Sequence, residues 1–167
     1  MNFARKIFVA EGGKGLSVRR VAQHASCTTM AVYSRFGGNE GLLEALFDEG
    51  FKRLADAQAK VDADLPPVAR VLGLCRAYRA TALAFPHHCA LMLGAFSGEH
   101  LPSPGSSERA MSTLLTLTKA VLAALPPAEA RDRRSAIATK FQPAGWTPRL
   151  GLRAKPVARE FMRRQER

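Results

Sequence analysis

Cysteine is scarce in this sequence, and the few cysteines present follow no framework spacing. There are three, Cys27, Cys75 and Cys89, and no two of them form a C-x-x-C pair. An odd number without that pair argues against both a disulfide scaffold and a four-cysteine zinc site. We therefore expect three buried free thiols.

Long hydrophobic runs are also missing. No stretch of about 18 or more apolar residues occurs, and the opening MNFARK lacks the apolar segment of a secretion signal. The sequence therefore predicts neither a membrane span nor export, and we expect a cytoplasmic protein.

Motifs of catalysis are absent as well. The sequence contains no glycine-rich phosphate loop, no nucleophile elbow and no carboxylate–histidine constellation. A small helical enzyme would have to use Cys89 with a histidine, and we rank that hypothesis last. We predict that the protein is not an enzyme and has no catalytic residues, cofactor or metal ion.

Positive charge, in contrast, is abundant but unevenly distributed. The chain has 25 Lys and Arg against 14 Asp and Glu, a net charge of +11. Residues 1–60 hold nine basic against six acidic side chains, residues 61–130 five against five, and residues 131–167 eleven against three. Binding of nucleic acid by the N-terminal part must therefore be argued from residue pattern and not from net charge.

Apolar residues recur at helical intervals along most of the chain, and no strand pattern competes. This periodicity predicts an all-α fold. The expected helices cover residues 3–10, 18–25, 29–36, 40–60, 68–85, 87–96, 109–125 and 128–140. We expect a loop at residues 101–107 and no packed helix in the Pro-, Gly- and Arg-rich residues 141–167.

The same spacing predicts which side of each helix is buried. In the first helix, Phe3 and Ile7 are expected to face inward with Phe8 or Ala10. Two later helices have predicted apolar faces made of Val71, Leu72, Cys75, Tyr78, Ala82 and Phe85, and of Ala110, Leu114, Leu117, Val121 and Leu125.

Two of the expected helices are short and nearly consecutive. Ser17 and Thr28 are their N-cap candidates, because a hydroxyl can accept a hydrogen bond from the first helical turn. A connection of about three or four residues is typical of a helix-turn-helix, whose second helix enters the major groove. In that second helix we expect Ala31, Val32 and Phe36 to face inward and Thr29, Met30, Tyr33, Ser34 and Arg35 to face outward.

Residues 4–47 resemble the DNA-binding region of the Tet repressor (TetR) family of bacterial regulators. The resemblance lies in residues 10–25 (AEGGKGLSVRRVAQHA), 32–36 (VYSRF) and 40–45 (EGLLEA). It implies that residues 29–36 form the recognition helix and that the chain forms a homodimer. It further implies a DNA-binding set in which Ser17, Thr28 and Tyr33 contact phosphates and Thr29, Met30, Ser34 and Arg35 form the base- or backbone-facing surface.

The chain departs from the family pattern at several positions. Ser26 replaces the usual glycine of the inter-helix turn, and Asn39 replaces the lysine that clamps the DNA backbone, so Asn39 joins the DNA-binding set without a charge. The basic arm before the first helix is missing, and residues 141–167 do not resemble paired dimerisation helices. Arg19 and Arg20 are further candidates for phosphate contact, with an ordinary solvated face as the alternative.

The C-terminal part contains candidates for a pocket that binds a small apolar effector. Methionine and aromatic side chains around a few polar groups suit such a pocket. The candidates are Tyr78, Phe85, His88, Met92 and Phe96. Plain core packing is the alternative. A metal cluster of His87, His88, Cys89 and His100 is disfavoured, because adjacent histidines point to different sides of a helix.

These observations divide the chain into a helix-turn-helix domain at residues 1–47, an effector-binding and dimerisation domain at 48–140 and a divergent basic segment at 141–167. The leading hypothesis is a ligand-responsive transcriptional repressor whose homodimer binds a palindromic operator in double-stranded DNA. The alternative is a helical sensor or interaction protein of the same fold with weak or lost DNA binding.

Overall fold

The computed structural model describes residues 2–94 and 102–140, and all regular structure in these two ranges is helical. The elements are α1 (Asn2–Glu11), the 3-10 helix η1 (Gly13–Gly15), α2 (Val18–His24), α3 (Thr29–Phe36), α4 (Asn39–Gln58), α5 (Pro67–Ala84), α6 (Pro86–Met92), α7 (Pro104–Ala124) and α8 (Pro127–Lys140). The predicted all-α fold is confirmed. None of the described helices has the length and apolar content needed to cross a membrane.

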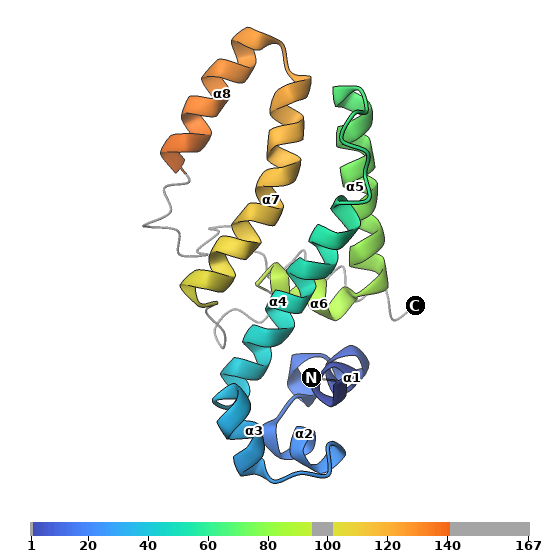
Figure 1. Cartoon of the computed structure of the whole chain (residues 1–167), viewed down its shortest axis with the longest axis vertical. Coiled ribbons are helices and arrows are strands. Elements are labelled where there is room, and N and C mark those ends of the chain that lie inside the picture. The colour runs from blue at the N-terminus through green and yellow to red at the C-terminus, as the bar shows by residue number, and fades with distance from the viewer. Residues whose placement is uncertain (1, 95–101, 141–167) are drawn as a thin grey trace.

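Helix α4 connects two groups of helices (Figure 1). The short helices α1, α2 and α3 gather at its first half, whereas α5 and α7 pack along its second half and α8 returns beside α7. Helix α6 lies between the groups and contacts α4, α5 and α1. The predicted boundary after residue 47 falls inside α4, so the division into domains stays a prediction.

The main hydrophobic core fixes the N-terminal helices to α4. Phe8 of α1 and Leu42 and Leu46 of α4 are fully buried, and the cluster extends to Leu91 of α6 and Ala110 of α7. Removal of this apolar surface from water stabilises the arrangement by about 25 cal/mol per Å². The core therefore bridges the two groups of helices.

The predicted apolar faces of α5 and α7 are only partly buried: Ala82 and Ala110 are buried as expected, and other predicted positions are exposed. In α5, Leu74 is buried, whereas Leu72 is 50% exposed. In α7, Leu114 and Val121 are exposed, and the buried positions are Ser106, Ala110, Thr113 and Ala120. Small side chains at these positions let α7 lie close to its neighbours, whereas Leu114 and Val121 point outward.

Several single positions also differ from prediction. Phe3 is 42% exposed, and Ala4 takes its place in the core. Ala31 is exposed, so only Val32 and, in part, Phe36 hold α3 on the core. Cys27 and Cys75 are exposed, and only Cys89 is the buried thiol that we expected.

Helix α7 begins within the segment that was predicted to be a loop. The Ser103 hydroxyl caps the helix by accepting a hydrogen bond from Ser106 N, and Pro104 occupies the first turn, where proline is favoured. The Glu44 carboxylate on α4 accepts a hydrogen bond from Ser103 N at 3.0 Å. The loop prediction was wrong because proline and serine here start a helix that α4 supports.

Candidate functional site

Helices α2 and α3 form the predicted helix-turn-helix, and each begins at the predicted cap. The Ser17 hydroxyl accepts a hydrogen bond from Arg20 N at 3.3 Å, and the Thr28 hydroxyl accepts one from Ala31 N at 3.2 Å. Both hydroxyls keep their own proton as a donor. The capping atoms can therefore also face an acceptor such as a phosphate oxygen.

The turn between the two helices is strained at Ser26. Its φ of 50° is the only positive φ of a non-glycine residue among those described. Cys27 N donates to Ala22 O at 3.0 Å, which closes the turn. Ser26 replaces the glycine that is usual at this position, and it adopts the left-handed conformation that a glycine would adopt without strain. The strain lowers the stability of the fold by roughly 1 kcal/mol.

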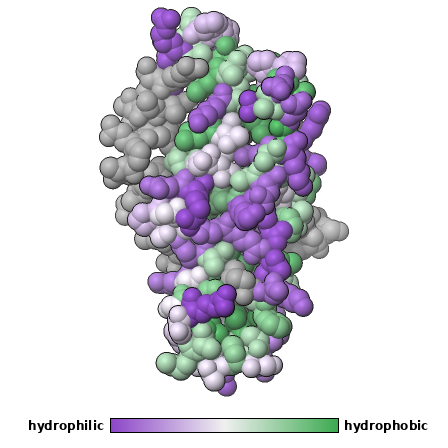
Figure 2. Space-filling view, in the orientation of Figure 1, coloured by the Kyte–Doolittle hydropathy of each residue, from purple (hydrophilic) through white to green (hydrophobic). Residues whose placement is uncertain are grey.

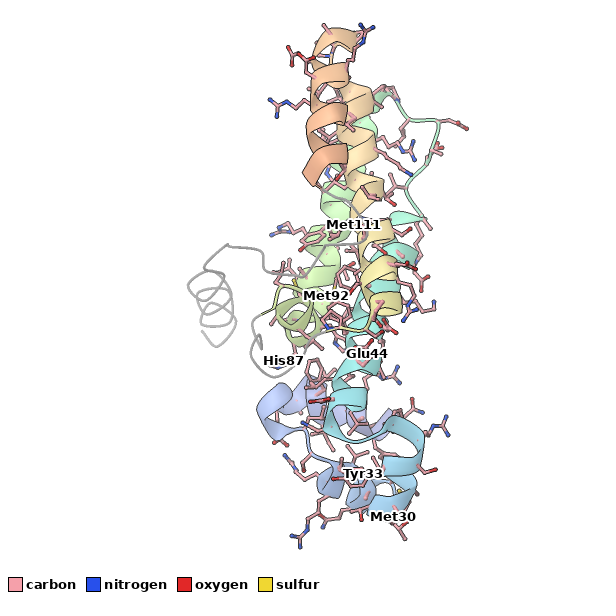
Figure 3. All side chains as sticks on the ribbon, turned by 90° about the vertical axis from the view of Figure 1, so that its left-hand side faces the viewer. Met30, Tyr33, Glu44, His87, Met92 and Met111 are labelled. Carbon is pink, nitrogen blue, oxygen red and sulfur yellow. The ribbon has the colours of Figure 1, made fainter. Side chains whose placement is uncertain are left out.

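Helix α3 presents a row of exposed side chains at the end of the molecule (Figure 3). Val32 is buried, whereas Met30 is 73% exposed and Tyr33 is 52% exposed. Thr29, Ser34 and Arg35 are exposed as well. The structure brings these predicted positions to one helix whose opposite side is anchored in the core.

Two glycines allow α3 to turn directly into α4. Gly37 has φ 72° and Gly38 has φ 120°, both rarely adopted by other residues. A Cβ on Gly38 would lie 3.2 Å from Cε1 of Tyr33, so the ring packs against this turn. Asn39, the first residue of α4, is exposed beside it.

One of the basic side chains near this face, Arg20, is bound within the fold. The Arg20 guanidinium donates two hydrogen bonds of 2.6 Å to the Glu11 carboxylate and one of 2.8 Å to Gly15 O. The hydrogen bond from Arg20 holds the pKa of Glu11 below its usual value. Figure 2 shows that hydrophilic side chains gather across the middle of the molecule, whereas the end with α2 and α3 is mostly pale or hydrophobic. Arg20 is thus committed within the fold, while Arg19 is exposed.

A second candidate site is a small cavity between α4, α5 and α6. Its volume is about 10 Å³, and its lining includes four of the five predicted pocket residues, Tyr78, Phe85, His88 and Met92. The fifth, Phe96, lies outside the described residues. The remaining lining comes from Gly50, Arg53, Leu54, Thr81, Ala82 and Cys89.

His88 is the most unusual residue of this cavity. It is 1% exposed, and neither ring nitrogen has a hydrogen-bond partner among the described residues. The ring contacts Phe8 and Phe85 edge-on, with centroid distances of 5.1 and 6.0 Å. Burial lowers the pKa of His88 to about 4, so the imidazole is neutral at neutral pH.

An ion-pair network connects the cavity to α1. Glu49 of α4 accepts hydrogen bonds from Arg53 at 2.6 Å and from Arg5 of α1 at 3.2 Å. Burial raises the pKa of Glu49, but these two arginines outweigh it and hold the pKa below its usual value. Arg53 also lies over the Phe85 ring, 4.1 Å from its centroid. The network and the Phe8–His88 contact join the two groups of helices.

Two members of the disfavoured metal cluster, His88 and Cys89, line the cavity. No group of three metal-binding side chains occurs in the described ranges, and His100 of the disfavoured metal cluster lies outside them. Burial raises the pKa of the Cys89 thiol and, with a contribution from Cys89, raises the pKa of Tyr78 to about 12. Cys89 is therefore a protonated thiol and not an activated nucleophile.

Sequence reasoning missed the part of the cavity that α4 supplies. Gly50 and Arg53 lie there with Leu54, and a Cβ on Gly50 would meet the Met92 sulfur at 2.8 Å. A glycine inside an apolar helical face is the signal that could have indicated this close approach of α6.

The comparisons with known proteins agree with this geometry. Residues 1–46 match the model of bacterial regulatory proteins of the tetR family. A protein of unknown function from Rhodococcus sp. RHA1 has a similar structure, with 28% identity, a TM-score of 0.64 and coverage of 81% of this chain and 74% of that chain. No curated protein matches the chain.

Two further structures share the fold at lower identity. The candidate regulatory protein SCO4313 is 22% identical, with a TM-score of 0.64 and coverage of 99% of this chain and 77% of that chain. The TetR family transcriptional regulator PfmR from Thermus thermophilus is also 22% identical, with a TM-score of 0.52 and coverage of 95% of this chain and 92% of that chain. Residues 1–46 are thus similar to the DNA-binding region of the tetR family of bacterial regulatory proteins, and the chain as a whole shares the fold of these structures.

Proposed function

We propose that the protein is a cytoplasmic, ligand-responsive repressor that binds a palindromic operator as a homodimer. The main support for this proposal is the set of exposed side chains on α3, which are Thr29, Met30, Tyr33, Ser34 and Arg35. They face solvent from a helix that the buried Val32 fixes to the core. Two such helices related by a two-fold axis would enter major grooves about 34–36 Å apart, or a multiple of that distance.

The contacts with DNA are assigned by position. Ser17, Thr28 and Tyr33 would donate to phosphates, and Asn39 would add an uncharged contact at the start of α4. Thr29, Met30, Ser34 and Arg35 would form the base- or backbone-facing surface. Because Arg20 is bound to Glu11, its charge would contribute little to the affinity for DNA phosphates. Sequence-specific contacts would therefore supply a larger share of the affinity than in a strongly basic DNA-binding protein.

Exposed apolar side chains on the long helices support the homodimer. Val68 and Leu72 of α5 and Leu114 and Val121 of α7 are all at least 39% exposed. Burial of such residues in a symmetric interface would stabilise a second copy against them.

Selection of binding sites from random double-stranded DNA at two salt concentrations tests the proposal. We expect enrichment of a palindrome whose binding weakens with salt. Tyr33→Phe serves as the matched control for Tyr33→Ala, because it keeps the ring against Gly38 and removes only the hydroxyl. Tyr33→Ala should lose binding largely, and Tyr33→Phe by about tenfold.

The lack of free positive charge at two positions near this face favours a second candidate, a helical sensor or interaction protein with weak or lost DNA binding. Arg20 is engaged by Glu11, and Asn39 provides no charge. A folded dimer that enriches no sequence at low salt would support this candidate and contradict the repressor.

A further inference from the structure

His88 combines deep burial with unused hydrogen-bonding capacity. A neutral imidazole has one donor and one acceptor, and neither is used by a described residue. A buried polar group left without a hydrogen-bond partner destabilises the fold. A ligand that enters the cavity and bonds to the ring would remove this penalty.

The charges around His88 favour a negative ligand. Arg53 and Arg5 flank a single acid, Glu49, so this cluster has a surplus of one positive charge. Nε and Nη2 of Arg53 both donate to Glu49, at 3.1 and 2.6 Å. Its Nη1 donates to no described protein group, and both Arg53 and His88 lie against the Phe85 ring at the cavity.

The rest of the lining would accommodate an apolar body. Leu54, Ala82, Phe85 and Met92 give the wall apolar side chains. The present volume of about 10 Å³ would hold no more than about one water molecule. Met92 packs against Gly50 through a flexible thioether, so its displacement is the least costly way to enlarge the cavity.

We propose that the effector is a small organic acid whose carboxylate binds His88 and Arg53 and whose apolar body displaces Met92. The inference rests on the proposed function, in which this cavity is the effector site. The effector would then be apolar except for one anionic group.

Binding of an acid would be linked to proton uptake. The carboxylate would favour the imidazolium form of His88, so the complex would take one proton from solvent on forming the ion pair. The groups facing His88 are Glu49 and Arg53 of α4, Arg5 of α1, and its neighbour His87 of α6. Tyr78 of α5 and Cys89 of α6, on the same cavity, stay protonated at neutral pH.

Isothermal titration calorimetry tests the inference on the full chain. The probes are acetate, hexanoate, decanoate, benzoate and phenylacetate, each paired with its own primary amide, in phosphate and in Tris buffer at neutral pH. At least one acid should bind about tenfold more tightly than its amide. The difference in heat between the buffers should give about one proton taken up per acid and none per amide.

His88→Phe should remove both the acid preference and the proton uptake. His87→Phe is the matched control, because His87 is adjacent in sequence but does not line the cavity. If His88→Phe fails to fold, Arg53→Gln tests the same preference. Equal binding of acids and amides, no binding of any acid, or an unchanged preference in both variants would overturn the inference.

The DNA-binding assay separates this failure from failure of the proposed function. If an amide binds the cavity and releases the selected operator, the ligand-responsive repressor stands and only the acid class is wrong. If no operator is selected, the repressor is wrong, and the calorimetry still decides whether the cavity recognises acids.

Discussion

The helices before α4 and the long helices after it bury their side chains in different ways. In the first group, large residues such as Ile7, Phe8 and Val21 fill a shared core with α4. In α5 and α7, Leu74 is the one large apolar side chain that is fully buried among the described positions, and the other buried positions are small. The first group is thus held mainly by large buried side chains, whereas the second leaves several large apolar side chains exposed, such as Leu72 and Leu114, which the proposed dimer would cover.

Among the substitutions considered, Phe8→Ala should destabilise the packing of α1, α2 and α3 on α4 the most. Phe8 is fully buried and contacts His88, so its loss should lower the free energy of unfolding by about 3–5 kcal/mol. Phe3→Ala is the control on the same helix, with an expected loss of about 0.5 kcal/mol or less. Urea denaturation measures both, and equal losses would contradict the assigned inward side of α1.

Leu74→Ala and Leu72→Ala should have different effects on stability, because they lie on the buried and the exposed side of α5. Leu74 is buried, so its truncation should lower the free energy of unfolding by about 2–5 kcal/mol. Leu72 is half exposed, so its truncation should cost the monomer about 1 kcal/mol or less. It should instead weaken the proposed dimer, which sedimentation measures. A large loss of monomer stability for Leu72→Ala would show that the inward side is misassigned.

The pH dependence of unfolding should reveal the histidine between the groups. Burial lowers the pKa of folded His88 to about 4, whereas unfolded histidine titrates at about 6.5. The unfolded state therefore binds more protons between these values, and stability falls as pH falls through this window, on the order of 3 kcal/mol in total. The pKa values of Glu49 and Glu11 are lowered from the ordinary glutamate value, so protonation of these two groups affects stability mainly at lower pH.

His88→Phe isolates this contribution in denaturation curves between pH 7 and pH 4. The variant should lose most of the slope within about pH 4.5–6.5. An unchanged slope would assign the proton uptake to other groups and contradict a buried neutral His88.

Ser26→Gly should produce the smallest effect, and a favourable one. Glycine adopts φ 50° without strain, so stability should rise by about 0.5–1 kcal/mol. Ser34→Gly, in the interior of exposed α3, is the control and should lose about 0.5 kcal/mol. Thermal melts measure the pair, and a loss for Ser26→Gly would mean that the serine side chain stabilises the turn.

The sequence predicted the helix-turn-helix well because its signals are local. Ser17 and Thr28 cap the helices that follow them, and Val18, Val21 and Ala22 form one apolar stripe. The α5–α7 contact was not predictable in this way. Apolar residues occur on several sides of both helices, and Ser106 and Thr113 are buried by tertiary packing that no local period encodes.

The cavity was predicted only in part for the same reason. Tyr78, Phe85, His88 and Met92 were found from their chemistry within one stretch of sequence. Arg53 and Gly50 come from the preceding long helix and join the site through the approach of α6 to α4.

The uninterrupted course of α4 has a mechanical consequence. Its 20 residues form a rod about 30 Å long, with α3 joined directly to its first residue and α5 and α7 packed along its middle and later part. A tilt of α4 by about 5° about its C-terminal end would move its N-terminal end by nearly 3 Å. In a two-fold symmetric dimer, the distance between the two recognition helices would change by about twice that amount. In the proposed dimer, a ligand that moved α6 away from Gly50 would need to cause only a slight rotation of α4 to change the spacing of the two recognition helices.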